Sequence, residues 1–349
     1  MVFWISPEIR AATIACNRGR PTLLGHPRSD NAMHVRPHTW KANVAAESVN
    51  DADFMFGFQE LRDIMQLYDI PSDTWTSASS LPVPINHSNA GVVDSKIFVL
   101  GALQVSPEGE GIDGSWQAIG AGWVYDISTD TWEVLAPLPE GTERGAAAVG
   151  VHNKIIYLAG GMRSLELSPD GEQDTVDTVS AFDTVSGTWL SLPDAASRIP
   201  EGRDHAGGAV VGDVFYVLGG RCRGQNNTKD TVFSLDLGNT NAGWQVSPSR
   251  MPTPRGGISV GTVQTRIYTF GGEGNQAEGS LGVFNETEVF DAEAETWSEL
   301  QPMKLPRHGT SAVAVGERIY IPGGGLIQGA DPVNVTDVYL SGVEAVTSM

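Results

Sequence analysis

The chain alternates between short apolar segments and polar turns, and one arrangement of these segments returns several times. A run of aliphatic and aromatic residues ends on two glycines, an aromatic residue followed by aspartate comes later, and a tryptophan ends the unit. In the clearest unit these are Ile155–Gly161, Phe182-Asp183 and Trp189. Short apolar runs bounded by glycine predict β-strands, and repetition at a nearly fixed interval predicts a repeat architecture.

The clearest units share the complete arrangement, whereas two earlier units are degenerate. The glycine pairs of the clear units end at Gly161, Gly220, Gly272 and Gly324. The earlier units contain Ile97–Ala102, where alanine replaces the second glycine, and Phe54–Phe58. We predict four short strands for each unit. The innermost strand is rich in small residues, which suits strands that converge near a crowded axis.

This arrangement resembles the kelch repeat. The resemblance covers roughly residues 41–340 and implies an all-β fold, a six-bladed β-propeller of four-stranded blades. We expect residues 1–40 to be an irregular or ring-closing segment and residues 341–349 to be a C-terminal tail. The last unit has no tryptophan after Val338-Tyr339, so an N-terminal strand is expected to supply its outer position.

Charge and composition exclude several classes of partner. The formal net charge of the 349 residues is -20, which disfavours binding to nucleic acid or to anionic lipid. No apolar run approaches the roughly 18 residues that a membrane helix requires. Cys16 and Cys222 are too few for a disulfide framework. We expect a monomer without a cofactor.

The compartment is left open by the sequence. Four Asn-x-Ser/Thr sequons begin at Asn86, Asn226, Asn285 and Asn334, and glycosylation there would require secretion. The N-terminal residues lack the sustained apolar stretch of a signal peptide. A secreted glycoprotein and a cytoplasmic protein are both compatible with these observations.

One face of a propeller carries both the turns between blades and the loops that follow the glycine pairs. We predict long loops after the glycine pairs, where binding normally resides: Leu103–Gly120, Met162–Val176, Arg221–Asp230, Glu273–Asn285 and Gly325–Val335. The turns between blades place polar residues just before each inner strand. The predicted ligand-binding residues in these turns are His87, Arg144, Arg203, Arg255 and Arg307. A cationic ring favours carboxylate, enolate or phenolate ligands. The alternative is that each arginine hydrogen-bonds nearby loop carbonyls.

Candidate acid–base chemistry is concentrated in the same turns. His205 and His308 are predicted catalytic residues, with Asp204 assisting, because histidine exchanges protons near neutral pH. Their alternative role is a turn network. Trp116 is predicted to line a ligand pocket, or else to hold its loop on the ring. No metal site is predicted, because the histidines are scattered and no cysteine pair has zinc spacing.

Two functions fit these expectations. In the first, the ring binds a small anionic or enolisable molecule at the channel mouth, as a cofactor-independent isomerase or cyclase, cycloaddition included. The resemblance supports it, since related propellers include a bacterial sialic acid mutarotase and fungal proteins that assist cyclisation. In the second, the ring is a protein- or glycan-binding scaffold without catalysis. No BTB, BACK or F-box segment is recognised, so we favour a stand-alone ring with a small ligand.

Overall fold

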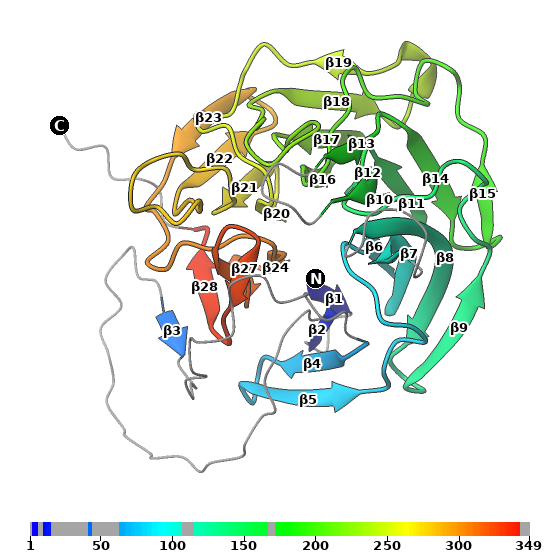
Figure 1. Ribbon diagram of the computed structural model, residues 1–349, viewed down its shortest axis with the longest axis horizontal. Helices are drawn as coiled ribbons and strands as arrows, with labels where there is room; N and C mark the ends of the chain where they lie inside the picture. The colour runs from blue at the N-terminus through cyan, green and yellow to red at the C-terminus, as the bar shows by residue number, and fades with distance from the viewer. Residues whose placement is uncertain are drawn as a thin grey trace.

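The computed structural model is an all-β propeller, in which antiparallel sheets surround a common axis (Figure 1). It describes residues 2–5, 10–14, 41–43, 63–106, 115–166 and 172–342. The alternation of apolar runs and glycine turns seen in the sequence produces these strands, with the small residues of the inner strands closest to the axis. Blades are numbered below in chain order.

Five blades have the predicted inner-to-outer strand order. The first blade consists of β6 (Ala90–Val93), β7 (Lys96–Val105), β8 (Trp116–Asp126) and β9 (Thr131–Leu135). The second blade consists of β10 (Ala148–His152), β11 (Ile155–Ala159), β14 (Val179–Asp183) and β15 (Thr188–Leu190). The third blade consists of β16 (Gly207–Val211), β17 (Val214–Leu218), β18 (Val232–Asp236) and β19 (Gln245–Val246). The fourth blade consists of β20 (Ser259–Val263), β21 (Arg266–Phe270), β22 (Thr287–Asp291) and β23 (Thr296–Glu299). The fifth blade is β24 (Val313–Val315), β25 (Arg318–Pro322), β28 (Thr336–Leu340) and β3 (Lys41–Asn43), and one 3-10 turn, Thr240–Ala242, follows β18.

The predicted count of six kelch-type blades is wrong, because the structure has five. The remaining sheet consists of β1 (Val2–Ile5), β2 (Arg10–Ile14), β4 (Met65–Asp69) and β5 (Thr74–Ala78). Its outer strands β4 and β5 carry the aromatic-aspartate step and the tryptophan of the predicted first unit, Tyr68-Asp69 and Trp75. Its inner strands come from the segment expected to be irregular or ring-closing, and β1 lies between β24 and β6. The predicted strand Phe54–Phe58 lies outside the described residues.

The fifth blade takes its outermost strand from the N-terminal part of the chain. Strand β3 pairs antiparallel with β28, with Asn43 opposite Thr336 and Lys41 opposite Val338. A strand from the N-terminal part of the chain therefore supplies the outer position of the last blade, as the missing tryptophan of the last unit led us to expect. This backbone pairing joins the N-terminal strand β3 to the C-terminal strand β28 of the last blade.

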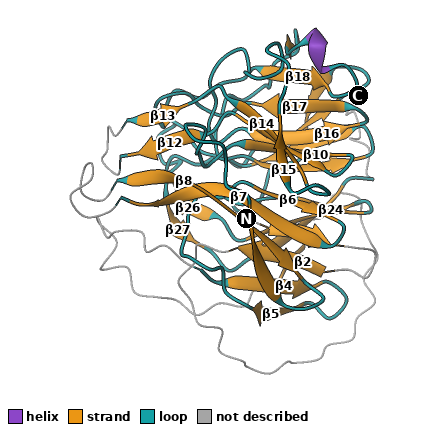
Figure 2. Cartoon of the chain, turned by 90° about the vertical axis from the view of Figure 1, so that its right-hand side faces the viewer, coloured by secondary structure: helices purple, strands orange, loops and turns teal. Residues whose placement is uncertain are grey.

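Several of the predicted long loops contain regular strands. Strands β7 and β8 continue past the glycine position as a long hairpin, and β12 (Met162–Leu165) pairs with both β8 and β13 (Gln173–Thr175). Another short hairpin joins β26 (Gly325–Ile327) to β27 (Ala330–Pro332). Figure 2 shows β8, β12, β13, β26 and β27 projecting from one side of the ring. This face therefore carries ordered hairpins above the inter-blade turns.

The tryptophans that end the repeat units contribute contacts between blades and remain partly exposed. Trp75 is 37% exposed, and Trp132, Trp189, Trp244 and Trp297 are half-buried. The indole of Trp132 donates to the Ser79 carbonyl at 2.9 Å, and that of Trp244 donates to the Ala196 carbonyl at 3.0 Å. The indoles of Trp132 and Trp244 therefore reach the chain of the preceding sheet while part of each side chain stays exposed.

Candidate functional site

Four of the predicted ligand-binding residues, the turn arginines, are buried in the ring. Arg144, Arg203 and Arg255 are 0% exposed and Arg307 is 1% exposed. Arg255 donates from Nε to the Gly271 carbonyl at 2.6 Å and forms an ion pair with Glu288 at 2.6 Å. The same donation from Arg144 Nε reaches the Gly160 carbonyl at 2.7 Å. These arginines therefore make the hydrogen bonds to nearby carbonyls that the sequence offered as the alternative to ligand binding. Their role in binding a ligand stays a prediction.

The main chain of the same arginines joins each blade to the one before it. The N–H of Gly272 donates to the Arg307 carbonyl at 2.8 Å, and that of Gly161 donates to the Arg203 carbonyl at 2.6 Å. Gly271 has φ of +56°, and an added Cβ would lie 2.1 Å from the Arg307 oxygen. The glycine pair is thus required by the close approach of the next blade's arginine.

Two residues beyond each arginine position, the backbone adopts the left-handed conformation. In the first to fifth blades φ is +49° at His87, +55° at Ala146, +53° at His205, +61° at Gly257 and +65° at Gly309. Their peptide groups are hydrogen-bonded from blade to blade: Ala146 N to His87 O at 2.8 Å, His205 N to Ala146 O at 3.1 Å, Gly257 N to His205 O at 2.9 Å and Gly309 N to Gly257 O at 3.1 Å. Histidine is uncommon at positive φ, yet two blades place one in this ring of peptide groups.

His205 forms a buried hydrogen-bonded network with its neighbour Asp204 and with Arg221. His205 Nδ1 lies 2.7 Å from Asp204 Oδ1. Because a carboxylate only accepts hydrogen bonds, Nδ1 carries the proton and Nε2 presents its lone pair. Arg221 donates from Nη2 to that nitrogen at 3.2 Å and from Nε to Asp204 Oδ1 at 3.1 Å. His205 is thereby held as a neutral imidazole with an available basic nitrogen.

Glu273 connects this network to the fifth blade. Arg221 donates from Nη1 to Glu273, whose other carboxylate oxygen lies 3.3 Å from His308 Nδ1. His308 Nε2 lies 2.9 Å from the Ile327 carbonyl oxygen. His308 therefore faces an oxygen atom at each ring nitrogen, the Ile327 carbonyl at Nε2 and the Glu273 carboxylate at Nδ1.

Trp116 and His87 form the opposite, apolar side of the cluster. The His87 ring lies 4.9 Å from the His205 ring and 5.1 Å from the Trp116 ring, measured between centroids. Trp116 is 2% exposed and packs with Leu103, Met162 and Leu165. His87 Nδ1 is buried without a hydrogen-bond partner. We call the connected set the axial cluster: His87, Trp116, Asp204, His205, Arg221, Glu273 and His308.

The surroundings of the cluster favour neutral His87 and His205 and ionised Asp204 and Glu273. Burial and the nearby Arg221 lower the pKa of His205, although Asp204 acts in the opposite direction. Burial and His205 hold the pKa of His87 well below its usual 6.5. Burial disfavours ionisation of Asp204, but His205 and Arg221 lower its pKa overall. Burial also disfavours ionisation of Glu273, but the nearby Arg221 outweighs this effect and lowers the pKa of Glu273 to about 2.

We expect the free energy of unfolding to fall as the pH is lowered from about 7 to 5. The unfolded histidines take up protons near their ordinary pKa of 6.5, whereas folded His87 and His205 resist protonation. His87 and His205 therefore contribute fully to the free energy of unfolding above pH 6.5, and this contribution is lost as the pH falls below 6.5. Asp204 and Glu273 act in the same direction, but only below their own ordinary values of 3.8 and 4.5.

Urea unfolding followed by tryptophan fluorescence between pH 5 and 8 measures this effect. The dependence on pH should be weaker in His87→Gln than in the parent protein, whatever the absolute stability of the variant. Identical slopes in the two proteins would show that His87 is protonated as readily in the fold as in the unfolded chain.

Comparison with known proteins identifies the family of the ring. Residues 169–324 match the family described as the KLHDC2/KLHL20/DRC7 Kelch-repeats domain. The chain is similar to Kelch-like protein terF of Aspergillus terreus, at 38% identity over 277 residues, covering 79% of this chain and 58% of that protein. The chain belongs to the kelch-repeat family.

Other similarities are to a kelch enzyme and to a solved structure. N-acetylneuraminate epimerase of Haemophilus influenzae is 29% identical over 143 residues, which cover 40% of this chain and 35% of that protein. A solved structure titled "Structure of YjhT" superposes with a TM-score of 0.63 at 16% identity, covering 78% of this chain and 87% of that one. The latter likeness supports the all-β propeller fold. The chain spans little more than half of terF, at 58% of its length.

The kelch ring brings together five of the predicted site residues and adds two that were not predicted. His87, Trp116, Asp204, His205 and His308 all lie in the axial cluster, whereas Arg144, Arg203, Arg255 and Arg307 have the buried contacts described above. Arg221 and Glu273 were missed. Both stand directly after a glycine pair, where other units have Leu103, Met162 or Gly325. A charged residue at this otherwise apolar or small position is the signal that would have found them.

The described part of the kelch ring contains no candidate metal cluster and no candidate membrane-spanning helix. There, no group of three or more histidine, cysteine, aspartate or glutamate side chains is arranged to hold a metal ion. Likewise, none of its described helical segments has the length and apolarity required to cross a bilayer.

Proposed function

We propose that the kelch ring binds a small organic molecule at the axial cluster and acts on it as a cofactor-independent acid–base catalyst. The observation that carries this proposal is the hydrogen bond of 2.7 Å between Asp204 and His205. It orients a neutral imidazole beside the buried guanidinium of Arg221. A base next to a fixed cation suits removal of a proton from a carbon adjacent to a carbonyl group.

The proposed reaction starts when Arg221 turns from His205 Nε2 to the carbonyl oxygen of the substrate, which frees the Nε2 lone pair to take the proton from the adjacent carbon. The electron pair of the broken C–H bond moves to the carbonyl oxygen, which becomes an enolate. Arg221 continues to donate to the enolate oxygen, while Asp204 stabilises the imidazolium. Return of the proton to the other face or to a neighbouring atom gives an isomer. Attack of the enolate carbon on a second carbonyl carbon of the same molecule gives a ring, in which the second carbonyl oxygen receives the electron pair of its C=O bond and takes the proton back from His205.

The residues around His205 and Arg221 support a substrate with both polar and apolar parts. Trp116, Leu103 and Met162 form an apolar cluster on one side, and Asp204, Arg221 and Glu273 are charged on the other. The similarity to a protein named N-acetylneuraminate epimerase also supports a small organic acid as substrate and an isomerisation as reaction.

The test is hydrogen exchange in heavy water followed by proton NMR. The substrates are N-acetylneuraminate for sugar acids, pyruvate for 2-oxo acids and acetylacetone for 1,3-dicarbonyl compounds. The protein should accelerate loss of the signal from the carbon next to the carbonyl in at least one class. No acceleration over buffer in any class, with a normal melting curve, would overturn the proposal and favour a protein- or glycan-binding scaffold.

A further inference from the structure

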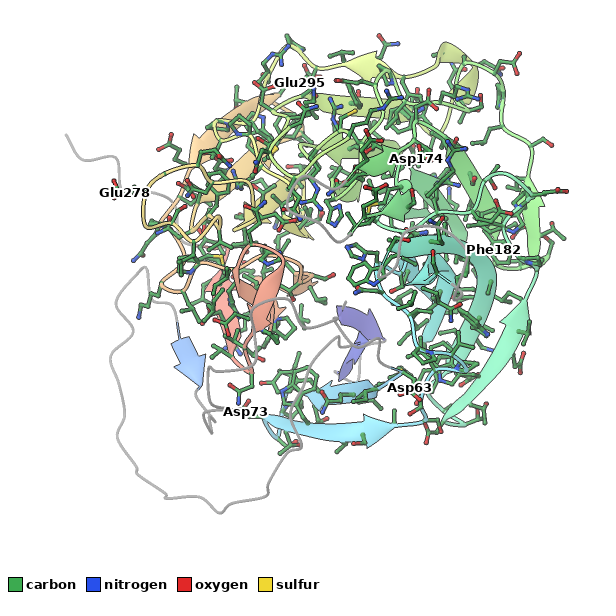
Figure 3. All side chains as sticks on the ribbon, in the orientation of Figure 1. Asp63, Asp73, Asp174, Phe182, Glu278 and Glu295 are labelled. Carbon is green, nitrogen blue, oxygen red and sulfur yellow. The ribbon has the colours of Figure 1, made fainter. Side chains whose placement is uncertain are left out.

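A polar groove of about 520 Å³ lies beside the axial cluster, between loops of the second and third blades. Its lining includes Arg163, Asp174, Thr175, Asp177, Arg198 and Arg223. Asp174, labelled in Figure 3, belongs to β13 of the projecting hairpin. The volume falls within the roughly 300–1,000 Å³ of small-molecule sites.

Every acidic residue that lines the groove is paired, whereas one of its arginines has no ion pair with a described residue. Glu201, which also lines the groove, pairs with Arg203 and Lys229. Arg163 and Asp174 pair through two hydrogen bonds, of 2.8 and 3.2 Å, and Arg198 pairs with Asp177 at 2.5 Å. Arg223 is exposed, and its guanidinium forms no ion pair with any residue in the described part of the chain. An exposed guanidinium in a concave polar site is the group that proteins use to bind a carboxylate with two parallel hydrogen bonds.

The main chain of Arg223 is tied to the axial cluster through Thr175. Arg223 has φ of +53°, and its N–H donates to Thr175 Oγ1 at 2.8 Å. The Thr175 hydroxyl in turn donates to Asp204 Oδ2, and Asp204 Oδ1 holds His205. An unbroken line of hydrogen bonds therefore runs from the groove to the imidazole.

We propose that this groove is a binding site for a small carboxylate, held by Arg223, and that Thr175 transmits its occupancy to Asp204 and His205. The binding site stands independently of catalysis at the axis, whereas the second part rests on the proposed role of His205. In that role Thr175 is a positioning residue, because it touches Asp204 rather than a reacting group.

Calorimetric titration with citrate, succinate and pyruvate tests the binding site. At least one of these probes should bind the parent protein, and Arg223→Gln should lower its affinity by about tenfold to a hundredfold, as expected for one lost charge-assisted contact. Arg250→Gln is the matched control, because Arg250 is exposed and pairs with Asp230 outside the groove. Absence of binding in the parent, or equal losses in the two variants, would overturn the site.

Histidine NMR spectra test the connection to His205. The His205 imidazole resonances, assigned with His205→Asn, should shift when the bound probe saturates the parent protein. The shift should persist in Thr175→Ser, which keeps the hydroxyl, and should vanish in Thr175→Val, which has the same shape without it. A shift retained in Thr175→Val, or absent in the parent, would overturn the connection. Failure of hydrogen exchange with the three carbonyl substrates would leave both results standing and would affect only the proposed catalysis.

Discussion

Replacing His205 by asparagine should lower the rate of hydrogen exchange by about 10²–10⁴-fold, the usual contribution of a general base. Asparagine tolerates the left-handed backbone that φ of +53° imposes at this position. It can still hydrogen-bond Asp204, but it has no basic nitrogen. The fold and the neighbouring Arg221 should therefore be preserved while the proton acceptor is lost.

The pH profile of the exchange reaction separates this role from a purely structural one. Since burial and Arg221 lower the pKa of His205 below its ordinary 6.5, the parent rate should already be at its plateau at neutral pH and should decline only in acid. A folded His205→Asn protein with an unchanged rate would remove His205 from the chemistry. His308→Gln is the comparison variant, and a smaller loss is expected because both nitrogens of His308 already face oxygen acceptors.

Replacing Arg255 by methionine should reduce the free energy of unfolding by about 3–5 kcal/mol, the usual effect of removing one partner of a buried ion pair. The change leaves Glu288, which is 1% exposed, without its cation. It also removes the donor to the Gly271 carbonyl. Urea unfolding measures the loss directly.

Two further variants show whether the buried pair is responsible. Arg266→Met removes a half-exposed arginine whose Nε lies 3.5 Å from Asp291 Oδ2. Because exposed ion pairs contribute little, this change should alter the free energy of unfolding by no more than about 1 kcal/mol. The double variant Arg255→Met with Glu288→Gln should recover part of the loss, because no unpaired charge remains. Equal stability of Arg255→Met and Arg266→Met would mean that Arg255 is available to bind a ligand, as the sequence alone suggested.

The blades were predictable where the repeat is complete. The runs ending at Gly161, Gly220 and Gly272 become the second strands of their blades because an apolar run, a tight turn and the next strand are all local in sequence. The sheet formed by β1, β2, β4 and β5 was not predictable in this way. Its inner strands β1 and β2 pair with each other locally but lack the glycine pair, and β2 pairs with β4, which is distant in sequence, so no repeat pattern marks them.

The candidate site was predicted in part for the same reason. Equivalent turns lie at equivalent places around the ring, so His87 and His205 were expected near one another and their rings are in contact. Burial was harder to foresee. Trp116 and Arg255 have the side chains of ligand-binding residues, but whether each faces a ligand or a neighbouring strand depends on hairpins whose paths the repeat does not specify.

The pairing of β3 with β28 has a consequence for the order of folding. Strands within one blade are close in the chain and can form early, whereas this pairing must bring together segments from the two ends of the described chain, with a large loss of chain entropy. During synthesis the fifth blade cannot be completed until β28 has left the ribosome, and until then it presents an unpaired edge. The seam at β3 is accordingly the last part of the ring to close and the first from which it would open.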